Sequence, residues 1–334
     1  MMLVLVLILL GLITALALQA QMVARMALRI GEGKALRAQL RAAATDTAWG
    51  ALHRLAGDAD LQVDHTNEPW AVTEERLLLN GIDTWVRIED ENRRFDVNSL
   101  SVRLSADTGR MPVDIITDLL RLLRQPDPAV QAQALKDWID QDHDGLRETD
   151  YYRNLKPPVT IADAFMESPR ELAAVLAWSG SSGDLPAGVP AGIAVLPARD
   201  TASGAVGGPA RNTAHSAVGG PVRNAAPASG RRIMPVNLNT ADREVILAVL
   251  GPEHAGAAAM LCGLRDAGPL VSLTALNRLL KASPDNSWNR YFDVKSSFFS
   301  VMARASKNGR VEEIYALVCR DPQGNVDILR WLCR

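Results

Sequence analysis

The first twenty residues restrict the fold more than any other part of the chain, because they contain no charged side chain. The run from Met1 to Ala20 is apolar except for Thr14 and Gln19. At 1.5 Å per residue, about 20 helical residues cover a hydrocarbon core of roughly 30 Å. The run therefore predicts a transmembrane helix over residues 1–20. A cleaved secretory signal is the alternative, but such signals usually begin with basic residues, and none precedes this run.

The helical pattern continues beyond the apolar run. Hydrophobic or small side chains recur about every 3.6 residues, which is typical of an amphipathic helix: Met26, Ile30, Leu36, Leu40, Ala44, Thr47, Ala51, Leu52 and Leu55. A single helix to Leu55 would be on the order of 80 Å long, apolar all round in its first half and amphipathic in its second.

The charges near the span give a conflicting signal about orientation. The nearest basic residues, Arg25, Arg29, Lys34 and Arg37, all follow it. Basic residues favour the cytoplasmic side of a membrane, so this pattern alone would keep the rest of the chain in the cytoplasm.

Strand patterns occur near both ends of the remaining chain. Residues 82–91 alternate between two faces, and Asn92-Arg93 can turn the chain into a short returning strand over residues 94–97, which predicts a hairpin. Residues 291–303, 310–320 and 326–333 predict three further antiparallel strands, with Asn308-Gly309 and Gly324-Asn325 at the turns.

Helical patterns fill the region between these strands. One helical block is predicted from Pro112 to about Trp178, including a helix start at Ser168 with Glu171 able to close a capping box. A second block begins with a helix capped by Asn239 or Thr240 and continues with helices over about 255–265 and 273–281. Strands at both ends with helices between them predict an α+β fold, in which one sheet is interrupted by a helical insertion.

A stretch rich in Gly, Ala, Pro and Ser separates the two helical blocks. It runs from residue 180 to residue 232 and contains few large apolar side chains, so we expect a linker. Residues 205–214 recur in similar form as residues 217–226. Two copies without aromatic residues indicate a duplicated linker segment and not a folded repeat.

Several local sequences, in order along nearly the whole chain, resemble the K-type minor pseudopilins of bacterial type II secretion, the general secretion pathway protein K family. The matching segments are residues 94–100 (RFDVNSL), 137–142 (DWIDQD) with Glu148 and Tyr151, Pro157-Pro158, Ser168 with Glu171-Leu172, 236–241 (VNLNTA), and the closing strands from Tyr291-Phe292 to Trp331.

The resemblance implies a fold and a role. The fold is a pilin-like long N-terminal helix packed on an antiparallel sheet, with a large inserted all-α domain of helix-hairpin-helix or SAM-like type. The role is a non-catalytic one in a tip complex with I-type and J-type minor pseudopilins, which caps or initiates a periplasmic pseudopilus for protein export. The resemblance also implies a single-pass inner-membrane protein whose bulk is periplasmic. A short basic leader, removed by a prepilin peptidase, is expected ahead of the apolar run, which would resolve the conflict over orientation.

The domain boundaries follow from these patterns. They are a transmembrane helix at 1–20, a pilin-like helix with the first strands at 21–100, and a first helical part at 101–179. After them come the linker at 180–232, a second helical part at 233–288, and terminal strands that complete the sheet at 289–334.

An acidic loop within the first helical block predicts a metal site. Residues 140–145 read DxDxDG, the first half of an EF-hand-type loop, in which alternate carboxylates converge on calcium and the glycine allows a sharp turn. The candidate ligands are Asp140, Asp142, Asp144 and Glu148, although the usual Glu at the twelfth position is replaced by Tyr151. The resemblance likewise implies structural calcium in the helical domain. A solvated acidic turn without an ion is the alternative.

The segment from Asn237 to Ala241 suggests a competing function, because it also resembles the start of helix-hairpin-helix domains. A membrane-anchored nucleic-acid-binding protein of the competence type is therefore the alternative. Its turn would contain Pro252, which lacks an amide hydrogen, and Glu253, which would repel phosphate. The chain also has 36 basic and 38 acidic residues, without the basic excess of general nucleic-acid binders.

Neither catalytic motifs nor a disulfide framework is evident. No GxSxG or HExxH sequence occurs, and the five histidines are far apart in sequence. Of the cysteines Cys262, Cys319 and Cys333, the last two lie on neighbouring predicted strands. A turn near Gln323 would pair Cys319 with a residue near Asp327, so Cys319 and Cys333 are predicted to be free thiols.

Overall fold

The computed structural model describes ten parts of the chain. They are residues 2–71, 75–102, 104, 110–140, 144–145, 147–156, 158–179, 190–197, 233–282 and 287–333. The predicted linker lies outside these residues except for 190–197, and the duplicated segment at 205–214 and 217–226 lies outside them entirely.

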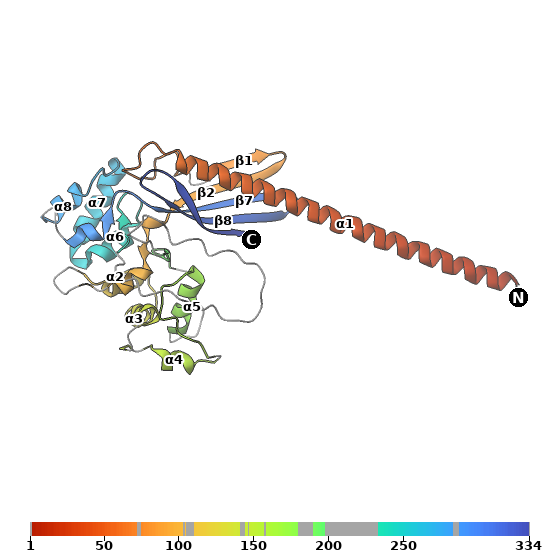
Figure 1. Cartoon of the computed structure of the whole chain (residues 1–334), viewed down its shortest axis with the longest axis horizontal. Coiled ribbons are helices and arrows are strands. Elements are labelled where there is room, and N and C mark those ends of the chain that lie inside the picture. The colour runs from red at the N-terminus through yellow and green to blue at the C-terminus, as the bar shows by residue number, and fades with distance from the viewer. Residues whose placement is uncertain are drawn as a thin grey trace.

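A single helix, α1 (Met2–Ala56), forms the N-terminal part of the molecule and projects far beyond the rest (Figure 1). Its C-terminal half packs on the sheet through small side chains at i, i+3, i+4 and i+7 spacing: Ala44, Thr47, Ala48 and Ala51 are buried, flanked by Leu40 and Leu55. Small side chains allow the helix backbone to approach the sheet closely, and leucines at either end add apolar area. The predicted long helix is confirmed.

The sheet has five antiparallel strands in the order β1-β2-β7-β8-β9. Their bounds are β1 (Glu75–Leu79), β2 (Ile82–Asp90), β7 (Phe298–Lys307), β8 (Arg310–Arg320) and β9 (Val326–Cys333). Strand β2 pairs directly with β7, from Asp83 opposite Ser306 to Asp90 opposite Phe299. The roughly two hundred residues between these strands are therefore an insertion into one sheet, as the sequence pattern predicts.

The inserted residues form a helical domain with a core of its own. Its helices are α2 (Pro112–Leu122), α3 (Pro128–Ile139), α4 (Thr149–Arg153), α5 (Pro169–Ser179), α6 (Arg243–Leu250), α7 (Ala255–Ala267) and α8 (Thr274–Leu279). Short 3-10 helices are η1 (Glu91–Arg93), η2 (Val97–Ser101), η4 (Pro252–His254) and η5 (Ser287–Arg290). Apolar side chains of α2, α3, α5 and α6, among them Leu119, Leu135, Val175 and Val249, are completely buried together. This domain lies at the end of the sheet away from the N-terminus (Figure 1).

The first predicted hairpin is wrong in its pairing. Strand β2 pairs with β1, which the sequence analysis did not predict, through the turn Asn80-Gly81, where both residues have positive φ. The segment expected to return as a strand contains β3 (Phe95–Asp96), which pairs in parallel with β4 (Ile193–Ala194). The reason is that Asp90 accepts a hydrogen bond from the Asn92 amide and starts η1, which carries the chain away from β2.

Two element boundaries also differ from the predictions. Helix α6 begins at Arg243 after Asp242, because the predicted caps Asn239 and Thr240 bond to Leu270 and Asp90 instead. The strand predicted over 291–303 is divided into β6 (Phe292–Asp293), which pairs in parallel with β5 (Val236–Asn237), and β7.

Residues 190–197 lie within the predicted linker but are packed into the fold. Ile193, Ala194, Val195 and Leu196 are all buried. Ile193 and Val195 belong to the helical core, while Ala194 and Leu196 pack with Phe298 and Cys319 of the sheet. This short apolar segment therefore joins the helical domain to the sheet.

Candidate functional site

The N-terminal half of α1 is the most exposed apolar surface of the described chain. None of the described side chains between residues 2 and 32 is buried, and the helix is long and apolar enough to cross a membrane. Such a surface is unfavourable in water but matches a hydrocarbon core. The chain is therefore membrane-anchored through α1. A fragment that starts at Arg25 would keep every buried side chain of the described residues.

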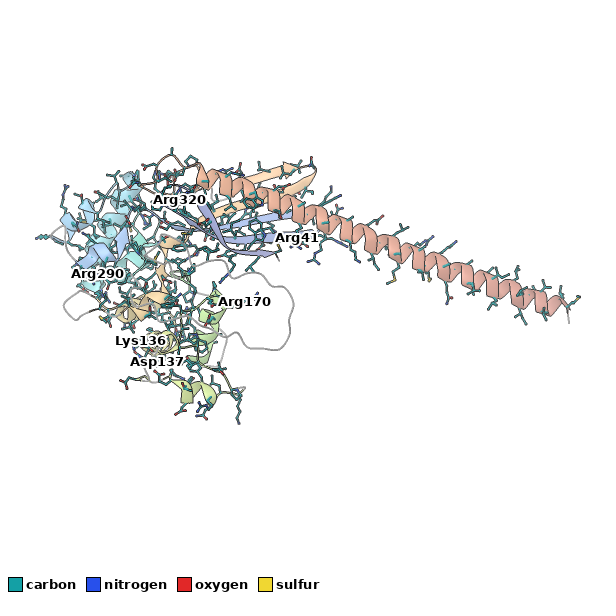
Figure 2. The ribbon with its side chains drawn as sticks, in the orientation of Figure 1. Arg41, Lys136, Asp137, Arg170, Arg290 and Arg320 are labelled. Carbon is teal, nitrogen blue, oxygen red and sulfur yellow. The ribbon has the colours of Figure 1, made fainter. Side chains whose placement is uncertain are left out.

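A second feature is a group of buried charged residues at the end of the sheet next to the helical domain. Alternate residues of β2 and β8 face α1, and Asp90 and Arg320 continue these two buried rows. Figure 2 shows Arg320 near the C-terminal end of α1, whereas Arg41 lies near the opposite end of the sheet. A charged residue that continues the buried row of a strand is the sequence signal that indicates this site.

Arg320 pairs with two carboxylates in this group. Its guanidinium bonds Asp58 at 2.5 Å and also Asp64, and these acidic side chains are only 3% and 0% exposed. The same guanidinium lies 4.8 Å from the centre of the Phe299 ring. Asp58, Asp64 and Glu68 bring carboxylate oxygens within 4.8 Å of one another. Because Arg320 already supplies a cation to two of them, the arrangement acts as a buried ion-pair network.

Asp90 connects this network to the helical domain. Its carboxylate accepts hydrogen bonds from the amide of Asn92 and from the side chains of Asn237, Thr240 and Ser296. The amide of Ser296 donates in turn to Asp64 at 2.7 Å. Residues after β2, at the end of β5, after β5 and before β7 thus meet at one carboxylate. We name Asp64, Asp90, Asn237, Ser296 and Arg320 the junction cluster.

The junction cluster changes the titration of its acids. Burial raises the pKa of Asp90 from 3.8 to about 6, although hydrogen bonds from Ser296 and Thr240 partly oppose this rise. Burial likewise raises the pKa of the nearby Glu68 from 4.5 to about 7, against hydrogen bonds from the His65 amide and Trp70. The folded state therefore holds these protons more tightly than the unfolded chain does.

We name the sheet, the half of α1 packed on it and the helical domain together the head. We expect the stability of the head to fall as the pH rises through this range. For Asp90, the effect develops between pH 4 and pH 6 and totals about 3 kcal/mol, since only the folded state remains protonated there. Asp90→Asn should reduce the slope of unfolding free energy against pH, measured by urea unfolding of the fragment from Arg25, and leave a smaller slope from Glu68. The exposed Asp83→Asn on the same strand is the control. If the wild type, Asp90→Asn and Asp83→Asn all showed the same slope of unfolding free energy against pH, the pH dependence could not be assigned to Asp90.

The structure describes three of the four predicted calcium ligands. Asp140, Asp144 and Glu148 are described, and Asp142 lies outside the described residues. Lys136 bonds Asp140 at 2.6 Å, one helical turn earlier on α3. Beneath the loop lies Asp137, a completely buried acid that was not among the predicted ligands; Figure 2 shows it next to Lys136.

The loop passes close to Asp137. The carboxylate of Asp137 accepts hydrogen bonds from the Arg147 amide at 2.9 Å and from Gln133 at 2.6 Å. A Cβ atom at Gly145 would overlap this carboxylate. The glycine of the acidic motif is therefore required by close approach to α3.

The turn that resembles helix-hairpin-helix motifs uses three of its amides inside the fold. Gly251 has a φ of 97°, and its amide donates to the carbonyl of Leu247 at 2.8 Å. The amides of His254 and Ala255 donate to the carbonyls of Gly251 and Pro252. The use of these donors inside the fold, and the acidic Glu253 beside them, disfavour a phosphate site at this turn.

The cysteines agree with the register predicted for the last hairpin. Cys319 lies opposite Asp327, and Cys333 lies opposite Ile314. All three cysteines are free thiols. The separation of Cys319 and Cys333 along the ladder thus prevents a disulfide, as predicted.

Comparison with known proteins gives the same interpretation as the fold. Residues 93–183 match the family model described as type II secretion system (T2SS), protein K. Within these residues the chain is therefore similar to the protein K family. No curated protein sequence matches it. A chain of the crystal structure of the GspK-GspI-GspJ complex from the enterotoxigenic Escherichia coli type 2 secretion system has a similar fold, with a TM-score of 0.64 and 17% identity, over 93% of this chain and 99% of that one.

Two of the segments that carry the sequence resemblance have structural roles here. In residues 94–100, Arg94 pairs with Glu89 and Glu91, and Phe95 is completely buried. In residues 236–241, Asn237 joins the junction cluster and Asn239 exchanges two hydrogen bonds with the backbone of Leu270. These segments therefore hold the helical domain to the sheet.

Proposed function

We propose that the protein is a minor pseudopilin of a type II secretion system. In this role it caps or initiates the periplasmic pseudopilus, as part of a tip complex with I-type and J-type minor pseudopilins. It acts by assembly and not by catalysis. The observation that carries the proposal is the continuity of α1, whose unburied apolar half leads without interruption into the helix packed on the sheet. Such a helix can rest in a membrane and later pack against neighbouring helices in a fibre.

The position of the helical domain supports a place at the tip. It lies at the end of the sheet away from the N-terminus of α1 (Figure 1). In a fibre whose subunits align their long helices, bulk at that end obstructs the addition of a further subunit above it. We infer that the anchor is in the bacterial inner membrane, that it crosses the membrane once, and that the bulk of the chain is periplasmic.

A reconstitution experiment tests the proposed assembly. The fragment from Arg25 should form a stoichiometric ternary complex with the I-type and J-type head domains of the same genome, detected by size-exclusion chromatography with light scattering. A parallel titration with duplex DNA should show no salt-sensitive affinity. DNA binding without assembly would instead favour the nucleic-acid-binding alternative.

We further propose that calcium stabilises the acidic loop through Asp140, Asp142, Asp144 and Glu148. The support is the alternate spacing of the carboxylates and the approach of Gly145 to the buried Asp137. The ion would be structural: its carboxylate ligands would join the end of α3 to the start of α4, and it would take no part in a reaction.

Calcium should therefore raise the melting temperature of the fragment from Arg25. At a calcium concentration about 100 times the dissociation constant, the expected stabilisation is about 2.7 kcal/mol. The double substitution Asp140→Ala, Asp142→Ala should abolish the rise seen by scanning calorimetry when EGTA is replaced with calcium. Asp58 and Asp64 of the other acidic group stay intact in this variant. If calcium still raised its melting temperature, the acidic loop would be excluded as the binding site.

A further inference from the structure

Two strand turns of the head point toward the membrane-anchoring half of α1. The β1–β2 turn is formed by Asn80-Gly81 and the β7–β8 turn by Asn308-Gly309. Figure 1 shows these ends of the strands on the side from which the N-terminal half of α1 projects. When that half spans a bilayer along its normal, this end of the head faces the membrane surface.

Basic side chains from the sheet are fixed at this end by contacts with α1 and with the other turn. The guanidinium of Arg310 donates to the carbonyl of Gly33 at 2.9 Å. A Cβ atom at Gly33 would lie 2.9 Å from the same guanidinium, so the glycine makes room for the contact. The ammonium of Lys307 lies beside Gly81, 3.7 Å from the position of a Cβ there.

Helix α1 adds further basic side chains next to these turns. Arg25, Arg29, Lys34 and Arg37 are all exposed. The acidic residues nearby are Glu32, Asp83, Glu312 and Glu313, and Glu312 is held by Arg37 at 2.6 Å. Six basic side chains therefore lie among four acidic ones at this end, although the whole chain has a net charge of -2. We name Arg25, Arg29, Lys34, Arg37, Lys307 and Arg310 the basic collar.

When α1 spans a bilayer, the basic collar lies at the level of the lipid headgroups. Arg25 is the first charged residue after the apolar run. Arg29 follows about 6 Å further along the helix, and Lys34 about 14 Å further. The polar headgroup layer is several ångströms thick on each side of the hydrocarbon core, and attraction to anionic lipids extends about one Debye length beyond it.

We propose that the basic collar binds anionic phospholipid headgroups and holds the head of the membrane-anchored protein close to the bilayer. Two elements separated by almost the whole chain length supply the charges, so all six are together only when the sheet is docked on α1. The inference rests on insertion of α1 in a membrane. It does not depend on the side of the membrane that the head occupies or on the identity of the pseudopilus partners, so its failure is distinguishable from failure to assemble a tip complex.

The test measures lipid retention by the full chain. Native mass spectrometry of protein from micelles with equal amounts of phosphatidylglycerol and phosphatidylcholine should show phosphatidylglycerol retained in roughly tenfold excess. The variant Arg25→Gln, Arg29→Gln, Lys34→Gln, Lys307→Gln should lose most of this preference. Arg310 is left unchanged because its contact with Gly33 helps to dock the sheet on α1.

A matched control removes the same charge from the far end of the head. Arg243, Arg278, Lys281 and Lys295 are exposed side chains of the helical domain and its connections, and their replacement by Gln should leave the lipid preference unchanged. Equal retention of both lipids by the wild type, or equal loss in both variants, would overturn the proposal. The double variant Arg25→Gln, Arg29→Gln changes only residues outside the head, so it tests the collar without affecting folding, and it should lose part of the preference.

Discussion

Arg320→Met is expected to lower the free energy of unfolding of the head by about 3–5 kcal/mol. The physical reason is that Asp58 and Asp64, both almost completely buried as side chains, would lose their shared cation. Methionine fills part of the volume and keeps contact with Phe299, so the loss reports charge and not a cavity. Urea unfolding at pH 7 of the fragment from Arg25, followed by circular dichroism, measures the change.

The control for this prediction is another arginine of the same sheet. Arg304 is exposed on β7, and Arg304→Met should change stability by no more than about 0.5 kcal/mol. The cost of Arg320→Met should also shrink in the background of Asp64→Asn, because the two residues interact directly. A cost below about 1 kcal/mol for Arg320→Met would mean that the two acids are not held by this guanidinium.

Asn98→Ala is expected to cost about 3 kcal/mol, since it leaves three buried backbone groups without their partners. The side-chain amide of Asn98 donates to the carbonyls of Met166 and Leu196 and accepts from the amide of Met166 at 2.8 Å. Asn98 itself is completely buried. One side chain thus connects three segments of the helical domain, and the loss should appear as a lower urea midpoint with an unchanged slope.

Asn67→Ala provides the comparison, because Asn67 is exposed and its removal should be nearly neutral. Hydrogen exchange can separate local from global effects of Asn98→Ala. Faster exchange of the Met166 amide and of its neighbours is expected beyond the change in global stability. If Asn98→Ala matched Asn67→Ala in both measurements, water would have to replace the lost hydrogen bonds.

Much of the fold is predictable from local sequence. The period of apolar residues predicted α1 almost to its last residue, and the turn at Gly324 predicted the pairing of Cys319 with Asp327. The helices of the inserted domain followed from their apolar stripes. These features depend on residues close together in the chain, where spacing alone decides which face is buried.

The candidate sites were harder to predict from sequence. The acidic loop is a compact motif, so a calcium site could be predicted there from sequence. That prediction can be tested by calcium titration. The junction cluster was missed, because Asp64, Asp90, Asn237 and Arg320 are separated by up to 256 residues. The sequence indicated the junction cluster in one way: Asp90 and Arg320 continue the buried rows of β2 and β8. The basic collar was partly visible as arginines after the span, but its contribution from Arg310 was not.

The sequence by itself determined the membrane-anchoring helix, the two-faced strands and the resemblance to the protein K family, because each depends on local period or local motif. Only the tertiary structure decided that β2 pairs with β1 and β7, that residues 190–197 are buried, and that charges distant in sequence meet in the junction cluster and the basic collar. The physical reason is that burial and pairing of charges depend on contacts between distant segments, and these contacts are set by the whole chain packing together.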